Sequence, residues 1–262
     1  MKLFKRFVDY RGRNRISPIF FGRRIGSWRV SPLRSRITYA REPFFDAALE
    51  YVTPESIVLD VATGDGAFAE RAGRDDFYLI DGNPDSVAKL KERYSNVQEV
   101  HLPELPFRDN FFDMIHASHI VEHLPPDVLY RFLQEADRCL KPGGYLVISA
   151  PLRNDLFYND LSHLRPYPPN VFFRYLVWGN DNCTTRPLVS KSYKIKTLCY
   201  AYQEKQPFDD DETGGELPYH HWCCCLSDLL YWFHRVKYAL GFRTLQKRAF
   251  TVVLQKHSES EN

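Results

Sequence analysis

The chain has 262 residues, of which 44% are hydrophobic and 15% aromatic, so it is long enough for one large domain with a sizeable core. It contains no run of 18 apolar residues and no apolar stretch near its start, so we expect neither a transmembrane helix nor a secretory signal. The net charge of +2 is unevenly distributed, because residues 1–41 carry twelve Lys or Arg and only one acid. These features predict a cytoplasmic protein with a basic N-terminal arm on an acidic body.

The basic arm, residues 1–41, is rich in glycine and proline after a short amphipathic start. Leu3, Phe4, Phe7 and Val8 would share one face of a helix, which is the pattern of a helix lying on a membrane surface. Three interpretations stay open for the arm. It could pack on its own acidic body, contact an anionic lipid or phosphate-bearing substrate at a membrane, or act as a mitochondrial transit segment. Large aromatics such as Trp28 speak against the last.

Beyond residue 41, predicted helices alternate with predicted strands, which indicates an α/β fold with a mostly parallel sheet. The predicted strands cover residues 57–59, 77–80, 97–102, 113–117, 145–150, 193–202 and 250–255. The predicted helices cover residues 43–51, the stretch after residue 66, and residues 85–94, 127–139, 171–178 and 226–240. We expect one domain over residues 42–262, within which residues 170–240 form a variable, partly helical insertion on the acceptor side.

A glycine-rich turn organises this domain. It follows the first buried strand and Asp60, and it reads Ala62-Thr63-Gly64-Asp65-Gly66. Glycines let backbone approach a ligand closely, and the helix that follows presents free N–H groups. Asp81 ends the next apolar run, and an acid about 20 residues after such a turn suits a ribose diol. The pattern predicts a nucleotide-type crevice.

These residues carry a family resemblance. The segment V-L-D-V-A-T-G-D-G (58–66) resembles motif I of the class I S-adenosylmethionine-dependent methyltransferases. Four more segments match in the family's order: Y-L-I-D-G-N-P (78–84), L-P-F-R-D-N-F-F-D-M-I (105–115), H-I-V-E-H-L (119–124) and L-K-P-G-G-Y-L-V-I-S-A-P (140–151). The resemblance implies a Rossmann-like sheet of seven mostly parallel strands flanked by helices, with S-adenosyl-L-methionine as cofactor.

The resemblance also implies a set of cofactor-binding residues. Asp60 would anchor the methionine ammonium through the turn backbone and water, and Asp81 would accept hydrogen bonds from both ribose hydroxyls. The full implied set is Asp60, Ala62, Gly64, Gly66, Asp81, Gly82, His101, Leu102 and Ser118. Two members depart from the family pattern. Ala62 replaces the first glycine, which is tolerable with a negative φ, and His101 replaces an acid that receives the adenine amino group.

The region N-D-L-S-H-L-R-P-Y (159–167) resembles a D-x-x-H-x-R-x-Y segment of methyltransferases from surface-glycan pathways. An alcohol acceptor needs a positioned base, so we predict His163 as the catalytic base and Asp160 as the residue that orients it. The alternative interpretation is a loop histidine with a structural hydrogen bond.

Two groups of potential metal ligands were weighed, and no metal is predicted. His119, Glu122 and His123 would share a helix face at i, i+3 and i+4, which can bind a divalent cation. Ubiquinone-pathway O-methyltransferases have an E-x-x-E-H metal site at this place, but His119 replaces its first glutamate. The run His220-His221-Trp222-Cys223-Cys224-Cys225 lacks paired spacing, which favours packing over zinc.

The leading hypothesis is an S-adenosylmethionine-dependent O-methyltransferase for a small-molecule or glycan-like acceptor, peripheral at a membrane. The alternatives are a quinone-type aromatic O-methyltransferase and a catalytically silent module that binds the cofactor or a partner. Nucleic acid is a disfavoured substrate, because the body is acidic and H-A-S-H (116–119) stands where an amino-methylating enzyme would have N-P-P-Y.

Overall fold

The computed structural model describes residues 40–154, 157–178, 185–204 and 245–258, together with three two-residue strands. These strands are β1 (Phe7–Val8), β2 (Asn14–Arg15) and β3 (Arg36–Ile37). Most of the basic arm, the run of residues 220–225 and the predicted helix over 226–240 lie outside the described residues. Within the described part of the chain, no helix is both long and apolar enough to span a bilayer.

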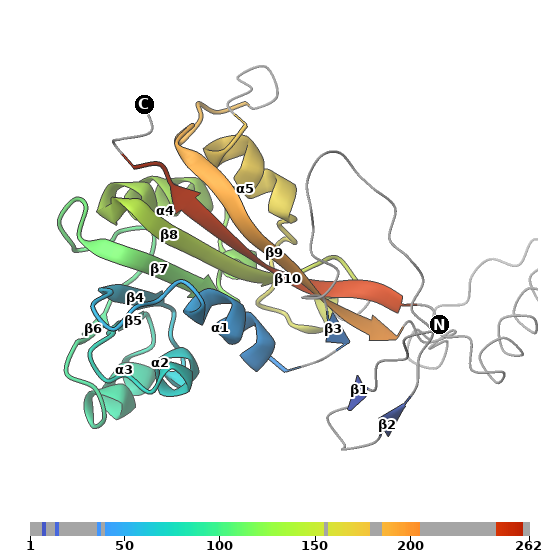
Figure 1. Ribbon diagram of the computed structural model, residues 1–262, viewed down its shortest axis with the longest axis horizontal. Coiled ribbons are helices and arrows are strands. Elements are labelled where there is room, and N and C mark those ends of the chain that lie inside the picture. The colour runs from blue at the N-terminus through green and yellow to red at the C-terminus, as the bar shows by residue number, and fades with distance from the viewer. Residues whose placement is uncertain are drawn as a thin grey trace, which may run out of the picture.

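The centre of the molecule is one mixed sheet (Figure 1), whose seven long strands lie in the order β9-β10-β8-β7-β4-β5-β6, with β3 paired to the outer edge of β9. All neighbours run parallel except β10, which is antiparallel to both β8 and β9. The prediction of a seven-stranded, mostly parallel sheet is confirmed. The long strands are β4 (Val58–Val61), β5 (Tyr78–Asp81), β6 (Val97–Glu99), β7 (Phe112–Ser118), β8 (Leu140–Pro151), β9 (Tyr193–Glu204) and β10 (Leu245–Lys256).

Helices cover both faces of the sheet. On one face, α1 (Glu42–Leu49), α2 (Ala67–Ala72) and α3 (Pro84–Lys91) bury side chains such as Phe45 and Phe68 against β4 and β7. On the other face, α4 (Pro126–Cys139) and α5 (Pro169–Leu176) bury Phe132 and Phe172. Because side chains alternate along a strand, Leu59 and Val61 pack on the α4 side, whereas Val58 packs on the α1 side.

The predicted elements that fall on described residues are present, but several of their ends differ. Strand β6 stops at Glu99 instead of residue 102, and α3 stops at Lys91 instead of residue 94. Strand β8 begins at Leu140, so Pro142-Gly143-Gly144 lies within the strand and not in a turn before it. Strand β9 lies inside the range 170–240 and is a full member of the sheet, because it pairs along most of its length with β10.

Candidate active site

A cavity of about 210 Å³ opens where four parallel strands end at the same edge of the sheet. Ligands of open α/β sheets bind at this edge. The residues that line the cavity follow β4, β5, β6 and β7: Val61, Ala62, Ile80, Asp81, Gly82, Val100, His101, Leu102, Ile120 and Leu124. Five of the nine predicted cofactor-binding residues are among them.

Asp81 is held in place by the backbone on both sides of the crevice. The N–H of Gly64 donates to its Oδ2 at 2.9 Å, and the N–H of Asn83 donates to its Oδ1 at 2.8 Å. Each carboxylate oxygen can accept more than one hydrogen bond, so both can still accept from a ligand hydroxyl. The carboxylate therefore links the glycine turn to the end of β5 and presents two acceptors to the cavity.

The turn after β4 begins with Ala62, whose φ is +53°. A negative φ, the condition under which alanine would be tolerable at this position, is therefore not met. Left-handed backbone strains a residue that has a Cβ, and such strain is concentrated at functional sites. Ala62 lines the cavity, so the strained residue lies where a ligand would contact the turn.

At two glycines of the predicted set, a side chain would meet close neighbours. At Gly66, φ is +80°, and an added Cβ would lie 2.9 Å from Leu90 Cδ2. At Gly82, an added Cβ would lie 3.1 Å from the Nδ1 of His101. Gly82 thus makes room for the exposed His101 ring, which also lies 3.5 Å from the Glu99 carboxylate, at the mouth of the cavity.

Asp60 faces inward and is only 2% exposed. Its Oδ2 accepts a hydrogen bond from Thr63 Oγ1 at 2.6 Å, and its Oδ1 lies 2.6 Å from the Nδ1 of the buried His116 on the neighbouring strand. The His116 ring stacks on Phe68, 3.8 Å between centroids. The Asp60 carboxylate therefore shapes the turn from inside, and any contact with a ligand passes through the turn backbone.

Strand β7 ends at Ser118, which pairs with Ser149 of β8 and is not part of the cavity lining. His119 follows with a φ of +55°, and its backbone N–H donates to the Ser149 carbonyl at 2.8 Å. The left-handed backbone turns the chain out of the sheet and into the 3₁₀ turn η1 (Val121–His123).

The prediction that His119, Glu122 and His123 share one helix face was wrong. The three residues do not share an α-helical face, because His119 precedes the 3₁₀ turn in a left-handed conformation. The structure instead groups Glu122 and His123 with His163, 40 residues further along the chain.

His163 lies on the loop after the 3₁₀ turn η2 (Phe157–Asn159). Its Nδ1 is 2.7 Å from the Phe157 carbonyl oxygen, and its Nε2 is 3.8 Å from Asp160 Oδ2. The other carboxylate oxygen of Asp160 accepts hydrogen bonds from the N–H and the hydroxyl of Ser162, which lower the pKa of Asp160 below its usual value. The Phe157 carbonyl therefore fixes the ring, and Asp160 is only a longer-range neighbour.

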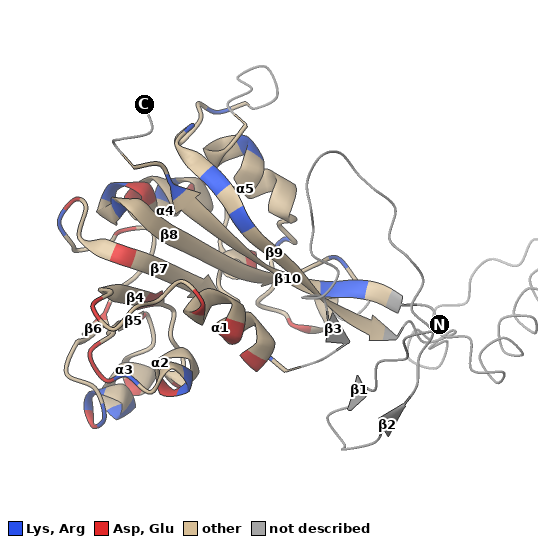
Figure 2. Cartoon of the chain, viewed as in Figure 1, with Lys and Arg blue, Asp and Glu red and all other residues tan. Residues whose placement is uncertain are grey.

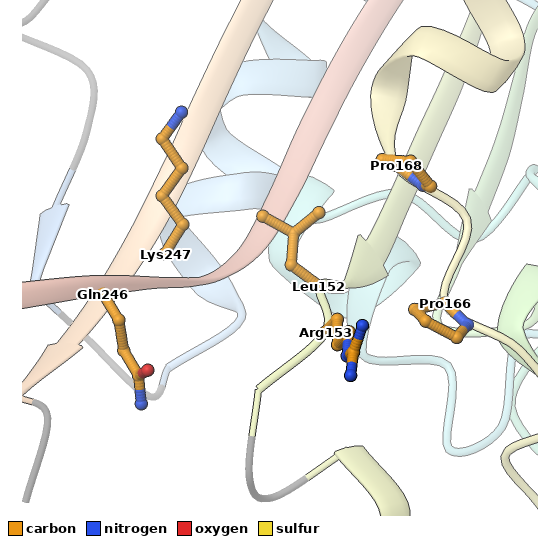
Figure 3. Close-up of a pocket in the computed structure, with 6 residues that line it drawn as sticks. All are labelled: Leu152, Arg153, Pro166, Pro168, Gln246 and Lys247. Carbon is orange, nitrogen blue, oxygen red and sulfur yellow. The ribbon is translucent and has the colours of Figure 1, made fainter.

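A second cavity, of about 550 Å³, lies beside the same loop at the ends of β8 and β10 (Figure 3). Its lining comprises Leu152, Arg153, Pro166, Pro168, Gln246 and Lys247. The Lys247 ammonium lies 3.7 Å from the centroid of the Tyr200 ring, and burial lowers its pKa. Lysines and arginines lie along β9 and β10, whereas acids gather on α1 and on the loops around β4 to β6 (Figure 2). Among the residues that the structure describes, the lining of this cavity carries two cationic side chains and no acid.

Sequence reasoning missed several residues of the site. His116 and Thr63 hold Asp60, and Val100, Ile120 and Leu124 complete the smaller cavity. The available signal for His116 was a histidine within the otherwise apolar strand predicted over 113–117. In the sheet, its register partner on β4 is Asp60.

A sheet of this strand order, with one antiparallel strand and a crevice at the carboxyl ends of β4 and β5, defines a Rossmann-like fold of the class I methyltransferase type. The comparisons with known proteins agree. A family model described as "Methyltransferase domain" matches residues 59–148. Residues 59–148 are thus similar to a methyltransferase domain, which agrees with the resemblance to the class I S-adenosylmethionine-dependent methyltransferases and with S-adenosyl-L-methionine as the expected cofactor.

A probable S-adenosylmethionine-dependent methyltransferase of Mycolicibacterium smegmatis is 34% identical over 76 residues. The match covers 28% of this chain and 29% of that relative, so the chain spans less than a third of the curated relative's length.

Solved structures share the fold at low sequence identity. A SAM-dependent methyltransferase from Archaeoglobus fulgidus matches with a TM-score of 0.50 at 18% identity, over 83% of this chain and 95% of that one. The YcgJ protein from Bacillus subtilis matches with a TM-score of 0.52 at 15% identity, over 83% of this chain and 99% of that one.

Proposed function

We propose that the protein is an S-adenosylmethionine-dependent methyltransferase that methylates an oxygen of a small-molecule or glycan-like acceptor. The observation that carries the cofactor part is the Asp81 carboxylate, fixed by two backbone N–H groups at the rim of a cavity. A fixed carboxylate with two free acceptor positions matches a ribose diol. In this reading His101 and Leu102 lie beside the adenine, and the turn at Ala62 meets the methionine portion.

The larger cavity supports a polar acceptor. Arg153 supplies positive charge, Gln246 supplies an amide, and Pro166 and Pro168 supply apolar walls. The Lys247 ammonium points away from the Gln246 amide and lies over the Tyr200 ring, so Lys247 contributes mainly its aliphatic stem (Figure 3). Such a lining offers hydrogen bonds to hydroxyls and attraction to a carboxylate or phosphate on the acceptor. We therefore favour an acceptor with hydroxyl groups and a negative charge over an uncharged aromatic ring.

Methyl transfer to an alcohol needs three things from the protein: an aligned oxygen, a held donor and a place for the proton. The acceptor oxygen attacks the methyl carbon, the carbon–sulfur bond breaks, and its electron pair stays on the sulfur. The alcohol proton must leave, and His163 is our candidate acceptor for it, through Nε2. His163 itself lines neither cavity, but its loop continues into Pro166 and Pro168 of the larger one, so the role requires the acceptor to extend from that cavity toward His163.

The basic arm, residues 1–41, is proposed to hold the enzyme at an anionic membrane surface on the cytoplasmic side. Its twelve Lys or Arg and its amphipathic start support this role. The acidic remainder of the chain makes nucleic acid a poor partner.

Two measurements test the proposal in sequence. Calorimetry with S-adenosylmethionine and S-adenosylhomocysteine should show one saturable site in the purified full chain. Incubation with methyl-labelled cofactor and cell extracts should then transfer label to a small or glycan-like molecule. Absence of cofactor binding would end the methyltransferase reading, whereas binding without any transfer would favour a silent binding module.

A further inference from the structure

A compact group of potential metal ligands lies outside both cavities. Glu122 and His123 belong to η1, and His163 belongs to the loop after η2. One ligand atom from each of the three residues lies within 4.8 Å of the other two. The two imidazole rings are 4.9 Å apart between centroids.

The backbone fixes which nitrogen of each histidine is available. The Nδ1 of His123 is 3.0 Å from the Ser162 carbonyl oxygen, and the Nδ1 of His163 is 2.7 Å from the Phe157 carbonyl oxygen. A carbonyl can only accept, so each Nδ1 must carry the proton and donate it. In the neutral rings, Nε2 then keeps its lone pair. This arrangement, with the second nitrogen donating to a carbonyl, is the one that metal-binding histidines adopt.

Glu122 adds a buried negative charge. The residue is completely buried, and neither carboxylate oxygen has a hydrogen-bond partner among the residues that the structure describes. The nearest group that can carry positive charge is the Nδ1 of His119, 3.2 Å from Oε1, which is an ion-pair distance without hydrogen-bond geometry. A buried carboxylate without a hydrogen-bond partner raises the free energy of the fold, and a bound cation beside Glu122 would lower it.

Backbone hydrogen bonds join the two segments that supply the ligands. The carbonyl of Glu122 accepts from the N–H of Leu164 at 2.9 Å and from that of Arg165 at 3.3 Å. The residues that flank His163 are thus tied to the residue that supplies the carboxylate. These bonds hold the two ligand-bearing segments at a fixed distance, as a preorganised binding site requires.

We propose that Glu122, His123 and His163 bind one divalent transition-metal cation, with zinc as the best match. Two imidazole nitrogens and one carboxylate oxygen are a ligand set of catalytic zinc sites, which leaves a position open for an oxygen of a substrate or water. The inference does not depend on methyl transfer, because it concerns cation binding alone. The Nε2 lone pair of His163 can hold a proton or a cation but not both, so metal binding competes with the role of His163 as a free base.

The test uses the metal-stripped full chain, in a background where Cys223, Cys224 and Cys225 are replaced by Ser so that thiolates cannot bind the probe. Titration with Co²⁺ is followed by its visible absorption bands, and Zn²⁺ displacement is followed by calorimetry. We expect one equivalent of Co²⁺ to bind and Zn²⁺ to displace it. His163→Ala and Glu122→Gln should each weaken Co²⁺ binding by more than roughly 10–100-fold. That is the loss expected when a residue that only hydrogen-bonds to a metal ligand is removed.

His101→Ala is the matched control, since His101 is an exposed histidine outside the group, and it should bind Co²⁺ as the parent does. Glu122→Gln has a second readout, because removal of a buried charge should raise the thermal midpoint of the metal-free chain while cation binding is lost. The proposal is overturned if the parent chain has no saturable Co²⁺ site, or if His163→Ala and Glu122→Gln bind Co²⁺ as tightly as the parent chain does.

Discussion

The left-handed backbone of Ala62 makes a prediction that runs against ordinary substitution rules: Ala62→Gly should stabilise the fold. A residue with a Cβ in this conformation costs roughly 1–2 kcal/mol, and φ is +53° at Ala62. Glycine removes that strain but adds about 0.4–1 kcal/mol of conformational entropy to the unfolded chain. The net expectation is a gain of about 1 kcal/mol, which corresponds to a rise of about 2–4 °C in the thermal midpoint for a domain of this size.

Two glycines of the same turn provide matched controls in the opposite direction. Gly64 has a φ of +60° and no atom within 4 Å of an added Cβ, so Gly64→Ala introduces backbone strain alone. It should cost about 1 kcal/mol by the same arithmetic. Gly66→Ala should cost more, because its Cβ would also lie 2.9 Å from Leu90 and 3.3 Å from Tyr94.

Urea unfolding without cofactor measures all three variants against the wild type. The midpoint should shift while the slope of the free energy of unfolding with urea stays constant. The expected order of stability is Ala62→Gly, wild type, Gly64→Ala and then Gly66→Ala. If Ala62→Gly is less stable than the wild type while Gly64→Ala is unchanged, a positive φ in this turn does not destabilise a residue with a Cβ, and the reasoning is refuted.

Three further predictions concern function. Asp81→Ala should weaken S-adenosylmethionine binding by about 1–3 kcal/mol in calorimetry, since a charged acceptor to two hydroxyls is lost, whereas Asp85→Ala on the adjacent helix should bind normally. Removal of residues 1–30 should leave cofactor binding intact and abolish association with anionic vesicles in a flotation assay; association of the full chain that does not weaken with salt would contradict this. Under the base hypothesis, His163→Ala should lower kcat by about 10²–10⁴ without changing cofactor affinity. Asp160→Ala should have a smaller effect, because Ser162 and not the imidazole holds its carboxylate. A chelator-resistant enzyme that stays fully active as His163→Ala would contradict that role.

The residues proposed to bind the cofactor could be brought together from the sequence because most of them follow the strands that position them. Strand β4, the glycine turn and Asp81 lie within 24 residues of one another, and parallel strands bring their carboxyl ends to one edge. Spacing along the chain therefore translated directly into proximity in space. The five predicted residues that line the smaller cavity all come from such strand ends.

The surroundings of His163 were harder to predict from the sequence, because the contacts there join distant segments of the chain. Glu122 and His163 are brought together by backbone hydrogen bonds between η1 and a loop, and no periodicity in the sequence reports such bonds. The helical spacing of His119 and Glu122 was misleading for a physical reason: a left-handed residue and a 3₁₀ turn replace the α-helix on which that spacing depends. The partner of Asp60, His116, is 56 residues away in the chain and is found only through strand register.

The two strained residues also show how the sheet itself shapes the crevice. Strands β4 and β7 are neighbours in the sheet, and each leaves it through a left-handed residue with a Cβ, Ala62 and His119. Hydrogen bonds to the neighbouring strands hold the chain where it leaves the sheet. Thr63 N–H donates to the Ile80 carbonyl of β5 at 3.1 Å, and His119 N–H donates to the Ser149 carbonyl of β8 at 2.8 Å. Because β5 and β8 enforce these conformations, the strain is balanced by sheet pairing and not by ligand contacts. A ligand that enters the crevice then meets a turn already formed, and less of its binding energy is spent on ordering the chain.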